Sequence, residues 1–326
     1  MPGTLDQHPQ LIGLDWGTSS LRAYLLGEDG ACLAQANGAF GILSIADAGF
    51  DAVYLKFCAG WQRAYGLLPV IASGMIGSRQ GWLEAPYVPC PATPAQISAS
   101  LASLAASDGA RIHFVPGLSC RNAWGIPDVM RGEETQLLGA MQSGGDALWV
   151  LPGTHSKWAR SAGGAIERFS TYMTGELYAL LCGHSILGRL MPADAQADPA
   201  ALQRGVRYGL SAGEDLLRKL FSVRTLGLFG EVPPEGLADY LSGLLLGAEI
   251  RDALCASPAA ADIGLIGDPA LCERYRIALQ IAGQRAHAVS ADATPRGLWR
   301  AAAHAGLVQP KIRTAPLHAP PSTPAP

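Results

Sequence analysis

Residues 11–26 have the sequence LIGLDWGTSSLRAYLL, in which two short apolar runs are separated by a polar turn. The first run, residues 11–15, stops at a turn that contains glycine, and the second, residues 21–26, alternates apolar and polar side chains in its first half. Short apolar runs bounded by Gly, Ser and Thr are typical of strands joined by a tight turn. Because a third such run follows at residues 31–36, the chain is predicted to open with a β-meander.

The second half of the chain repeats this arrangement. An apolar strand at residues 147–151 is followed by a turn at 152–156 and by a second strand at 157–161. The spacing of apolar residues predicts further helices and strands in both halves. In the first half we expect helices over 50–64 and 93–104 and strands over 69–73 and 111–115. In the second half we expect helices over 174–190, 213–222, 236–255, 268–282 and 293–306, and strands over 263–267 and 286–290.

These elements predict an α/β protein with two similar halves. Residues 10–144 and 145–309 are expected to form two domains, and residues 1–9 a flexible N-terminus. Residues 310–326 contain six of the 23 prolines, so this tail is predicted to be disordered.

Composition narrows the class of protein. Of the 326 residues 49% are hydrophobic and 16% charged, and the net charge of −3 gives no sign of nucleic-acid binding. Such an apolar composition also excludes a disordered chain. No apolar run approaches the ~18 residues that a membrane span needs. The seven cysteines form no CxxC pair, and the N-terminus has no basic, apolar leader, so a cytoplasmic protein without a disulfide framework or zinc site is predicted.

The turn between the first two strands has residues that suit an anion. Gly17 lets a ligand approach the backbone closely, and Thr18 and Ser19 supply hydroxyl donors. Consecutive backbone N–H groups in a turn can bind a phosphate, and Asp15 at the strand end can hold Mg²⁺. For this segment alone, an ordinary polar hairpin turn is an equal alternative.

The corresponding turn of the second half repeats this chemistry and adds a lysine whose ammonium group can meet a phosphate. One Gly-Thr turn is a weak signal, but one turn in each half indicates two loops that face the same polyphosphate across a cleft. The residues of the second turn are Gly153, Thr154, His155, Ser156 and Lys157.

An acidic segment lies near the end of the first half, ahead of the second turn. Glu133 and Glu134 open a predicted helix, where paired carboxylates can simply stabilise the helix dipole. Alternatively, one carboxylate of this segment, which also contains Asp128, acts as the general base that removes a proton from an attacking hydroxyl. The neighbouring Arg131 can hold an anionic substrate.

Two further loops carry candidate binding residues. The loop after the strand at 69–73 contains Gly74, Met75, Arg79 and Trp82, and an arginine suits a carboxylate while a tryptophan suits the face of a sugar. A surface loop with a solvated arginine is the alternative. Gly267 lies between a strand and a helix, where it can pass beneath a nucleotide or form an ordinary turn.

Taken together, these segments resemble the 2-dehydro-3-deoxygalactonokinase family, a branch of the sugar-kinase, Hsp70 and actin superfamily. The resemblance extends from about residue 11 to about residue 306. It rests on six stretches, of which the middle four are far more specific than a generic DxGT turn: residues 14–19, 74–87, 128–139, 151–158, 173–177 and 240–249.

The resemblance implies two RNase H-like domains of the actin-like ATPase type, with ATP and Mg²⁺ in the cleft between them. The implied reaction moves the γ-phosphoryl group of ATP to the 6-hydroxyl of 2-dehydro-3-deoxy-D-galactonate, a step in galactonate breakdown. The phosphates would be held by the two turns, with Asp15 also at the metal and Gly267 near the adenosine. The phosphate-binding residues would be Asp15, Gly17, Thr18, Ser19, Gly153, Thr154, His155, Ser156 and Lys157.

The same resemblance places a carboxylate in a Gly-acid-helix setting as the base. Glu133 is the first candidate, Glu134 the second and Asp128 the third. Neighbouring helix residues point about 100° apart, so the two glutamates do not face a cleft equally. Arg79 and Arg131 are the candidates for the substrate carboxylate, and the substrate loop adds Gly74, Met75 and Trp82.

Two other functions share part of this pattern. An exopolyphosphatase-like phosphohydrolase has two phosphate turns and a Gly-Glu-Glu helix start, but this acidic chain has few lysine clusters. A non-catalytic actin-like nucleotide sensor is the second alternative. Both 2-keto-3-deoxygalactonate and its C4 epimer, the gluconate analogue, fit the predicted substrate. The apolar residues 237–248 suit either a core helix or the face of a homodimer.

Overall fold

The computed structural model describes residues 8–45, 49–141, 145–256, 263–290 and 292–309. The first half is built on a six-stranded sheet of order β3-β2-β1-β4-β7-β6. Strand β2 is antiparallel to β1 and β3, whereas β4 is parallel to β1 and to β7. The strands are β1 (Leu11–Trp16), β2 (Leu21–Leu26), β3 (Cys32–Gly38), β4 (Val70–Ser73), β6 (Ala102–Ala105) and β7 (Arg111–Phe114).

The second half is built on a five-stranded sheet of order β12-β11-β10-β13-β14. Strand β10 is antiparallel to β11 and parallel to β13, just as β1 is antiparallel to β2 and parallel to β4. Both halves therefore follow the same path, and the predicted pair of RNase H-like units with an opening hairpin in each is confirmed. The strands are β10 (Ala147–Leu151), β11 (Ser156–Ala162), β12 (Ala165–Tyr172), β13 (Ile263–Leu265) and β14 (Ala286–Ala288).

A third, three-stranded sheet was not predicted. It consists of β5 (Tyr87–Pro89), β8 (Gly117–Arg121) and β9 (Pro127–Met130) in the order β5-β8-β9. Its strands are only three to five residues long and contain Gly and Pro, so they lack a clear strand pattern. An isolated bridge between Ala92 and Ile166 links the segment after β5 to β12 of the second half.

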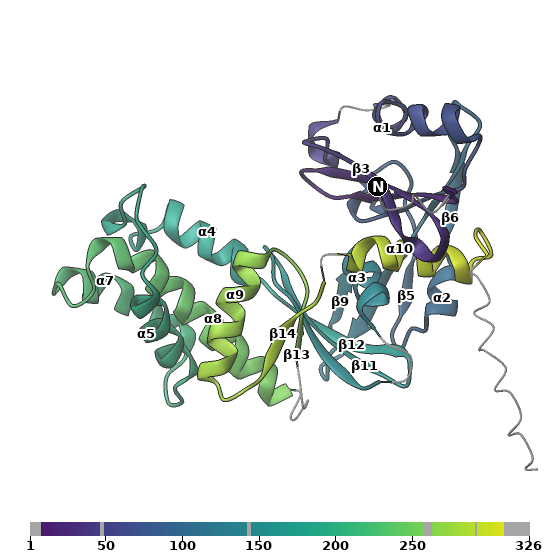
Figure 1. Ribbon diagram of the computed structural model, residues 1–326. Helices are drawn as coiled ribbons and strands as arrows, with labels where there is room; N and C mark the ends of the chain where they lie inside the picture. The colour runs from purple at the N-terminus through teal and green to yellow at the C-terminus, as the bar shows by residue number, and fades with distance from the viewer. Residues whose placement is uncertain (1–7, 46–48, 142–144, 257–262, 291, 310–326) are drawn as a thin grey trace, which may run out of the picture.

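Helices cover the sheets, and most of them belong to the second half (Figure 1). The helices of the first half are α1 (Phe50–Tyr65), α2 (Pro94–Ala99) and α3 (Glu133–Ala140). Those that follow are α4 (Thr174–His184), α5 (Pro199–Leu210), α6 (Leu216–Leu220), α7 (Ser222–Leu228), α8 (Leu237–Ala256), α9 (Pro269–Ile281) and α10 (Ala293–His304).

The helix predicted over residues 93–104 is wrong in its second part. Its start is confirmed, because Thr93 and Gln96 form a capping box at the beginning of α2. The helix ends at Ala99, however, and residues 102–105 form β6, which pairs with β7 so that Leu104 lies beside Ile112. The repeated Ser-Leu-Ala sequence fits a strand alternation as well as a helical spacing, and pairing with β7 decides between them.

The second half contains three further corrections. Helix α5 was not predicted, although Asp198 accepts hydrogen bonds from the first backbone N–H groups and Pro199 occupies its first turn. The single helix predicted over 174–190 ends at His184 and is followed by a short 3₁₀ turn at Gly188–Leu190. The helix predicted over 213–222 is reduced to α6, with α7 after it.

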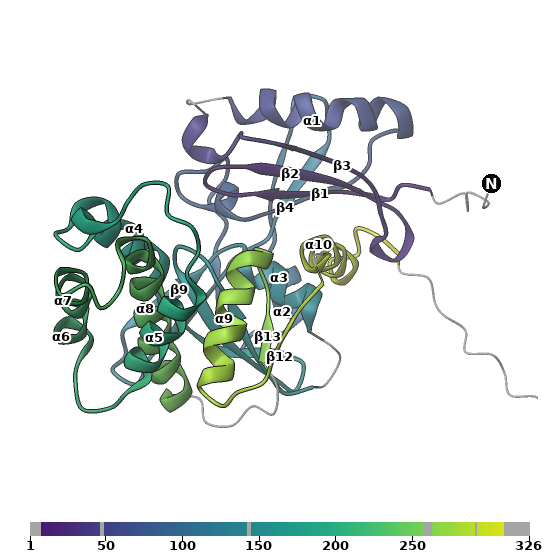
Figure 2. The ribbon, with the colours of Figure 1, turned by 60° about the vertical axis from the view of Figure 1, so that its left-hand side comes forward.

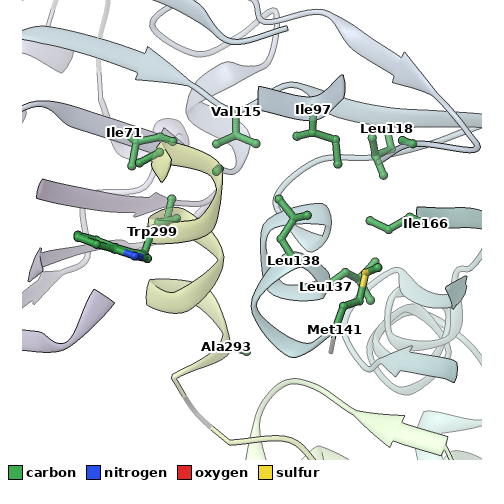
Figure 3. Packing of buried hydrophobic residues seen from close by; sticks show 14 of the residues in the cluster. Ile71, Ile97, Val115, Leu118, Leu137, Leu138, Met141, Ile166, Ala293 and Trp299 are labelled. Atoms are coloured by element: carbon green, nitrogen blue, oxygen red, sulfur yellow. The ribbon is translucent and has the colours of Figure 1, made fainter. Parts of the chain in front are cut away.

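The last helix, α10, follows the second half in the sequence but packs against α3, α2 and β1 of the first half. Figure 2 shows α1 on one side of the first sheet and α10 on the other. The core on this side contains Ile71, Leu137, Leu138 and Trp299, all labelled in Figure 3. The domain boundaries given above stay a prediction, and the predicted tail lies outside the described residues.

Helices α3 and α10 cross at two glycines. A Cβ added at Gly139 would lie 1.7 Å from the carbonyl oxygen of Ala293, and one added at Gly297 would lie 1.8 Å from that of Thr135. No side chain fits at either position, so the two helix backbones are in direct contact.

Helix α8 forms core. Leu237, Leu241 and Leu244 are fully buried, and the helix packs along α5. Of the two alternatives for residues 237–248, the structure therefore supports the core helix. Within the described residues, no helix is both long and apolar enough to span a bilayer.

Replacing Gly297 with alanine tests the helix crossing. Because the added methyl group meets backbone rather than a movable side chain, we expect Gly297→Ala to lower the free energy of unfolding by at least about 2–3 kcal/mol. Gly60→Ala is the control, since Gly60 lies inside α1 with nothing within 4 Å of an added Cβ. This control gains roughly 0.5–1 kcal/mol. Urea unfolding measures both, and equal stability of Gly297→Ala and the wild type contradicts the crossing.

Candidate active site

A cavity of about 660 Å³ lies between the two halves, and it is named the main cavity because both predicted turns border it. Its walls include the turn after β1 (residues 17–20, the first turn), the turn after β10 (residues 152–155, the second turn) and the starts of α3, α9 and α10. Twelve of the predicted site residues lie in this wall: Asp15, Gly17, Thr18, Gly74, Met75, Arg131, Glu133, Gly153, Thr154, His155, Lys157 and Gly267.

Three helices point their amino ends at the main cavity. Glu133 and Gln136 come from the first turn of α3, Pro269 begins α9, and Ala293 and Thr294 begin α10. The amino end of a helix presents free N–H groups and the positive end of the helix dipole. The cavity is therefore suited to an anionic ligand such as a phosphate chain.

The first turn is held from behind by residues 41–43. The backbone N–H groups of Ile42 and Leu43 donate to the carbonyl oxygens of Gly17 and Thr18, at 3.1 and 3.2 Å. Gly41 approaches the turn so closely that an added Cβ would lie 2.2 Å from the carbonyl oxygen of Thr18. The turn is thus fixed while the Thr18 side chain stays exposed to the cavity.

The second turn is held by the start of α4. The backbone N–H of Glu176 donates to the carbonyl oxygen of Thr154 at 3.0 Å, and the Glu176 carboxylate pairs with His155. Gly175 lies against the turn, since an added Cβ would be 2.5 Å from the carbonyl oxygen of Gly153. Both predicted phosphate turns therefore have a rigid support.

An ion pair crosses the cleft. Lys157 Nζ of the second half lies 3.1 Å from Glu133 Oε1 of the first half. Lys157 is almost completely buried and also donates to the carbonyl oxygen of His155 at 2.9 Å. The other oxygen of Glu133 accepts the backbone N–H of Arg131 at 3.0 Å. Glu133 thus connects the acidic segment to the second turn.

Asp15 lies at the end of β1, near two charged groups. Burial raises the pKa of the Asp15 carboxyl, the nearby Arg22 lowers it, and the negative charge of Glu133 raises it further. Arg22 Nη1 is 3.4 Å from Asp15 Oδ2. The described residues contain no cluster of three or more acidic, His or Cys side chains suited to a metal. Asp15 with Glu133 nearby instead fits a Mg²⁺ ion that keeps most of its ligands from water and phosphate oxygens.

Arg131 is buried with its charge partly unpaired. Its Nη2 donates to the carbonyl oxygen of Ala85 at 2.8 Å, and its guanidinium lies 4.4 Å from the centre of the Tyr87 ring. Only 9% of Arg131 is exposed, yet Nε and Nη1 have no hydrogen-bond partner among the described residues. Nε and Nη1 are enclosed by protein atoms, but Arg131 as a whole lines the main cavity, so its positive charge favours an anion placed there.

The structure places six predicted site residues outside the wall of the main cavity: Ser19, Arg79, Trp82, Asp128, Glu134 and Ser156. Ser19 and Arg79 are exposed. The ring of Trp82 packs between those of Trp16, Phe50, Tyr54 and Phe114, with centroids 6.1–6.4 Å away. Trp82 is thus part of the aromatic core rather than a platform for a sugar.

Three of these six residues bind neighbouring protein groups. Asp128 accepts the backbone N–H and the hydroxyl of Thr171 at 2.8 and 2.7 Å, and so joins β9 to β12. Ser156 is buried and donates to Glu249 at 2.9 Å. Glu134 is also fully buried, and its Oε2 accepts the backbone N–H of Gly132 at 2.7 Å. Each of these side chains is already engaged away from the cavity.

The carboxyl of Glu134 is strongly perturbed. Burial, together with the negative charge of Glu133, raises the pKa of Glu134 to about 7. Its Oε1 accepts the Thr135 hydroxyl at 3.0 Å, and Ser73 lies at the hydrogen-bond limit of 3.5 Å. Glu134 therefore supports the backbone from which Glu133 reaches the cavity.

Sequence reasoning missed several residues in the wall. Arg22 lies opposite Asp15 in the register of β1 and β2, a pairing that the predicted hairpin already contained. Gln136 lies one helical turn after Gly132, a spacing that the predicted helix start contained. Ser290 and Thr294 come from the end of the chain, and no local signal places them at the cleft.

A second cavity of about 570 Å³ adjoins the main one. The two cavities share Asp268 and residues 152–154 of the second turn. The walls of the second cavity come from α4, α8 and α9. They combine apolar Leu245, Leu246 and Leu271 with polar Ser242, Thr174 and Arg274. Apolar walls with a few polar groups suit a planar, partly polar ligand such as a nucleoside.

Comparison with known proteins gives consistent matches. The sequence matches the family model described as 2-keto-3-deoxy-galactonokinase over residues 15–301. It is 40% identical over 305 residues to the probable 2-dehydro-3-deoxygalactonokinase of Rhizobium meliloti (strain 1021), covering 90% of this chain and 96% of that protein. It is 37% identical over 298 residues to the 2-dehydro-3-deoxygalactonokinase of Escherichia coli (strain K12), covering 90% and 97%.

The fold is similar to a crystal structure assigned to a 2-dehydro-3-deoxygalactonokinase protein from Sinorhizobium meliloti. The TM-score is 0.81 at 39% sequence identity, and the match covers 90% of this chain and 98% of that one.

Replacing Glu134 with glutamine tests the raised pKa. A folded-state pKa above that of the unfolded chain means that the protonated carboxyl stabilises the fold, and this contribution is lost as the pH rises through about 7. Glutamine resembles the protonated form at every pH. We therefore expect the free energy of unfolding of the wild type, relative to Glu134→Gln, to fall by about 3 kcal/mol between pH 4.5 and pH 8. Urea unfolding across this range measures it, and a constant difference contradicts the assignment.

Proposed function

The chain belongs to the 2-keto-3-deoxy-galactonokinase family, and from that premise we propose that it transfers the γ-phosphoryl group of ATP to the 6-hydroxyl of 2-dehydro-3-deoxy-D-galactonate. The observation that carries the substrate class is Arg131, a buried cation in the wall of the main cavity. A sugar acid offers a carboxylate to this charge, whereas a neutral sugar does not.

The carboxylate of the sugar acid is proposed to bind Arg131. A guanidinium binds a carboxylate through two parallel N–H groups, and the second N–H of Nη2 can pair with Nε or with Nη1 in this way. The Tyr87 ring and the hydrogen bond to Ala85 hold the guanidinium in one orientation, so little conformational entropy of the side chain is lost on binding. Arg79, the other candidate from the sequence, is exposed and outside the cavity wall.

The phosphates of ATP are proposed to lie between the first and second turns. Gly17 and Thr18 face Gly153 and Thr154 across the cavity, and the amino ends of three helices add positive potential. Asp15 would hold Mg²⁺, which neutralises charge on the phosphate oxygens. The adenosine would occupy the second cavity, which shares Asp268 with the main cavity next to Gly267.

Glu133 is proposed as the general base. It is the one glutamate of the pair at the cavity wall, whereas Glu134 is buried behind it. Its present partner, Lys157, also donates to the carbonyl oxygen of His155 in the second turn. A phosphate bound at that turn would compete for Lys157, and the Glu133 carboxylate would then be free to accept the proton of the 6-hydroxyl.

The two alternatives are not favoured. The curated relatives that cover nine-tenths of the chain are named as kinases. Neither a phosphohydrolase nor a nucleotide sensor needs a buried arginine that is prepared for a second, carboxylate-bearing substrate.

Because ATP is the phosphoryl donor, we place the protein in the cytoplasm.

The first test is ADP release with ATP and Mg²⁺. We expect strong release only when 2-dehydro-3-deoxy-D-galactonate is present, and a kcat for Glu133→Gln that is lower by about 10²–10⁴-fold. The gluconate epimer and simple hexoses are run in parallel. Equal release with both epimers widens the substrate class. Release by the wild type without any sugar acid overturns the kinase, and near-normal kcat in a folded Glu133→Gln overturns the base.

A second test concerns the carboxylate subsite. Lysine keeps the charge of Arg131 but cannot bind a carboxylate through two N–H groups, so we expect Arg131→Lys to raise KM for the sugar acid by about 10–100-fold. KM for ATP should stay within about twofold. Arg79→Lys is the matched control, with both constants unchanged. A rise in KM for the sugar acid in Arg79→Lys, with none in Arg131→Lys, would move the subsite to the loop that contains Arg79.

A further inference from the structure

A buried carboxylate lies behind the second turn and contacts neither cavity. Glu249, at the end of the stretch 240–249, is only 4% exposed and belongs to α8. It lines neither the main nor the second cavity. Burial raises the pKa of its carboxyl, and the hydrogen bonds that it accepts oppose this rise. A buried carboxylate costs stability unless hydrogen bonds replace the hydration that it has lost.

Four side chains donate to Glu249. Ser156 Oγ and Trp158 Nε1 lie 2.9 and 2.7 Å from its Oε1. The hydroxyl of Tyr275 lies 3.0 and 2.9 Å from its two oxygens, and Thr174 donates to Oε2. The donors come from β11, α4 and α9, so a single carboxylate joins α8 to three other elements.

Each of these elements borders the nucleotide site proposed above. Ser156 directly follows the second turn, and Thr174 begins α4, whose next residues hold that turn through Gly153 and Thr154. Tyr275 and Thr174 also line the second cavity. Glu249 therefore fixes the second turn on one side and the wall of the second cavity on the other.

We propose that Glu249 is a positioning residue for the ATP site: it holds the second turn and the wall of the second cavity in the arrangement that binds the nucleotide. This inference rests on the proposed function only in naming ATP as the ligand. The site of the sugar acid lies in the first half, around Arg131. Loss of Glu249 should therefore weaken the binding of the nucleotide and leave that of the sugar acid unchanged.

Glu249→Gln is the main variant. All four neighbours are donors in the structure, and the Trp158 N–H cannot become an acceptor, so an amide cannot satisfy the same set. We expect the Kd for ADP and for a non-hydrolysable ATP analogue to rise about 10–100-fold, as for lost bonds to a charged group. KM for ATP should rise in parallel, while KM for the sugar acid stays within about twofold.

Two other variants separate positioning from general destabilisation. Lys219→Gln removes a buried lysine that caps the end of α5 through the carbonyl oxygens of Tyr208 and Ser211, away from both cavities. It should lower Tm and leave both substrate constants unchanged. Trp158→Phe removes one donor to Glu249 and also lies outside both cavities, so it should weaken nucleotide binding by a smaller factor, about 3–10-fold.

The measurements are calorimetric binding of the nucleotides, steady-state KM for both substrates, and Tm. A selective loss of nucleotide affinity in Glu249→Gln supports the proposal. If Glu249→Gln does not fold, the same selective loss in Trp158→Phe supports it instead. A Tm decrease with unchanged nucleotide Kd overturns it, as does an equal rise in both KM values. If the wild-type protein releases no ADP in the presence of the sugar acid, the proposed function is overturned. The role of Glu249 is still tested in that case, because it is measured by nucleotide binding.

Discussion

The direct contact between α3 and α10 is the constraint on which the cleft depends. Neither Gly139 nor Gly297 can accept even a methyl group, so the two helices have one way to pack. Each helix begins at the main cavity, α3 with Glu133 and α10 with Ala293 and Thr294. Because α10 follows the second sheet but packs on the first half, this crossing also ties the two halves together. The position of the proposed base relative to the second turn is thus set by two backbones in contact.

Local signals predicted the parts of the fold that local interactions form. The two hairpins and their turns are short-range structures, and the residues that build them lie next to each other in the sequence. The three-stranded sheet could not be predicted in this way, because its strands join segments up to about forty residues apart and none is longer than five residues. Residues 102–105 show the same limit. Their spacing fits a helix as well as a strand, and only pairing with β7 decides for the strand.

For the candidate site, residue type identified the segments but not the direction of each side chain. Trp82, Ser156 and Asp128 lie in stretches that were correctly singled out, yet their side chains pack into the protein or bind neighbouring groups. Arg131 shows the reverse case, a weak signal in the sequence and a clear one in the structure. Its sequence context shows only an arginine beside two acids, whereas its burial and its unpartnered N–H groups depend on Ala85 and Tyr87, which lie more than forty positions earlier.

The two halves also share a feature that strand order alone does not reveal. Behind the acidic segment lies Glu134, which accepts a backbone N–H and a hydroxyl, and behind the second turn lies Glu249, which accepts three hydroxyls and an indole N–H. Both carboxyls are buried, and burial raises the pKa of each. Each carboxyl joins several donors at one point, Glu134 at the start of α3 and Glu249 where α8 meets β11, α4 and α9. A carboxyl accepts more hydrogen bonds than any neutral side chain, and for that reason each half retains one despite the cost of burying it.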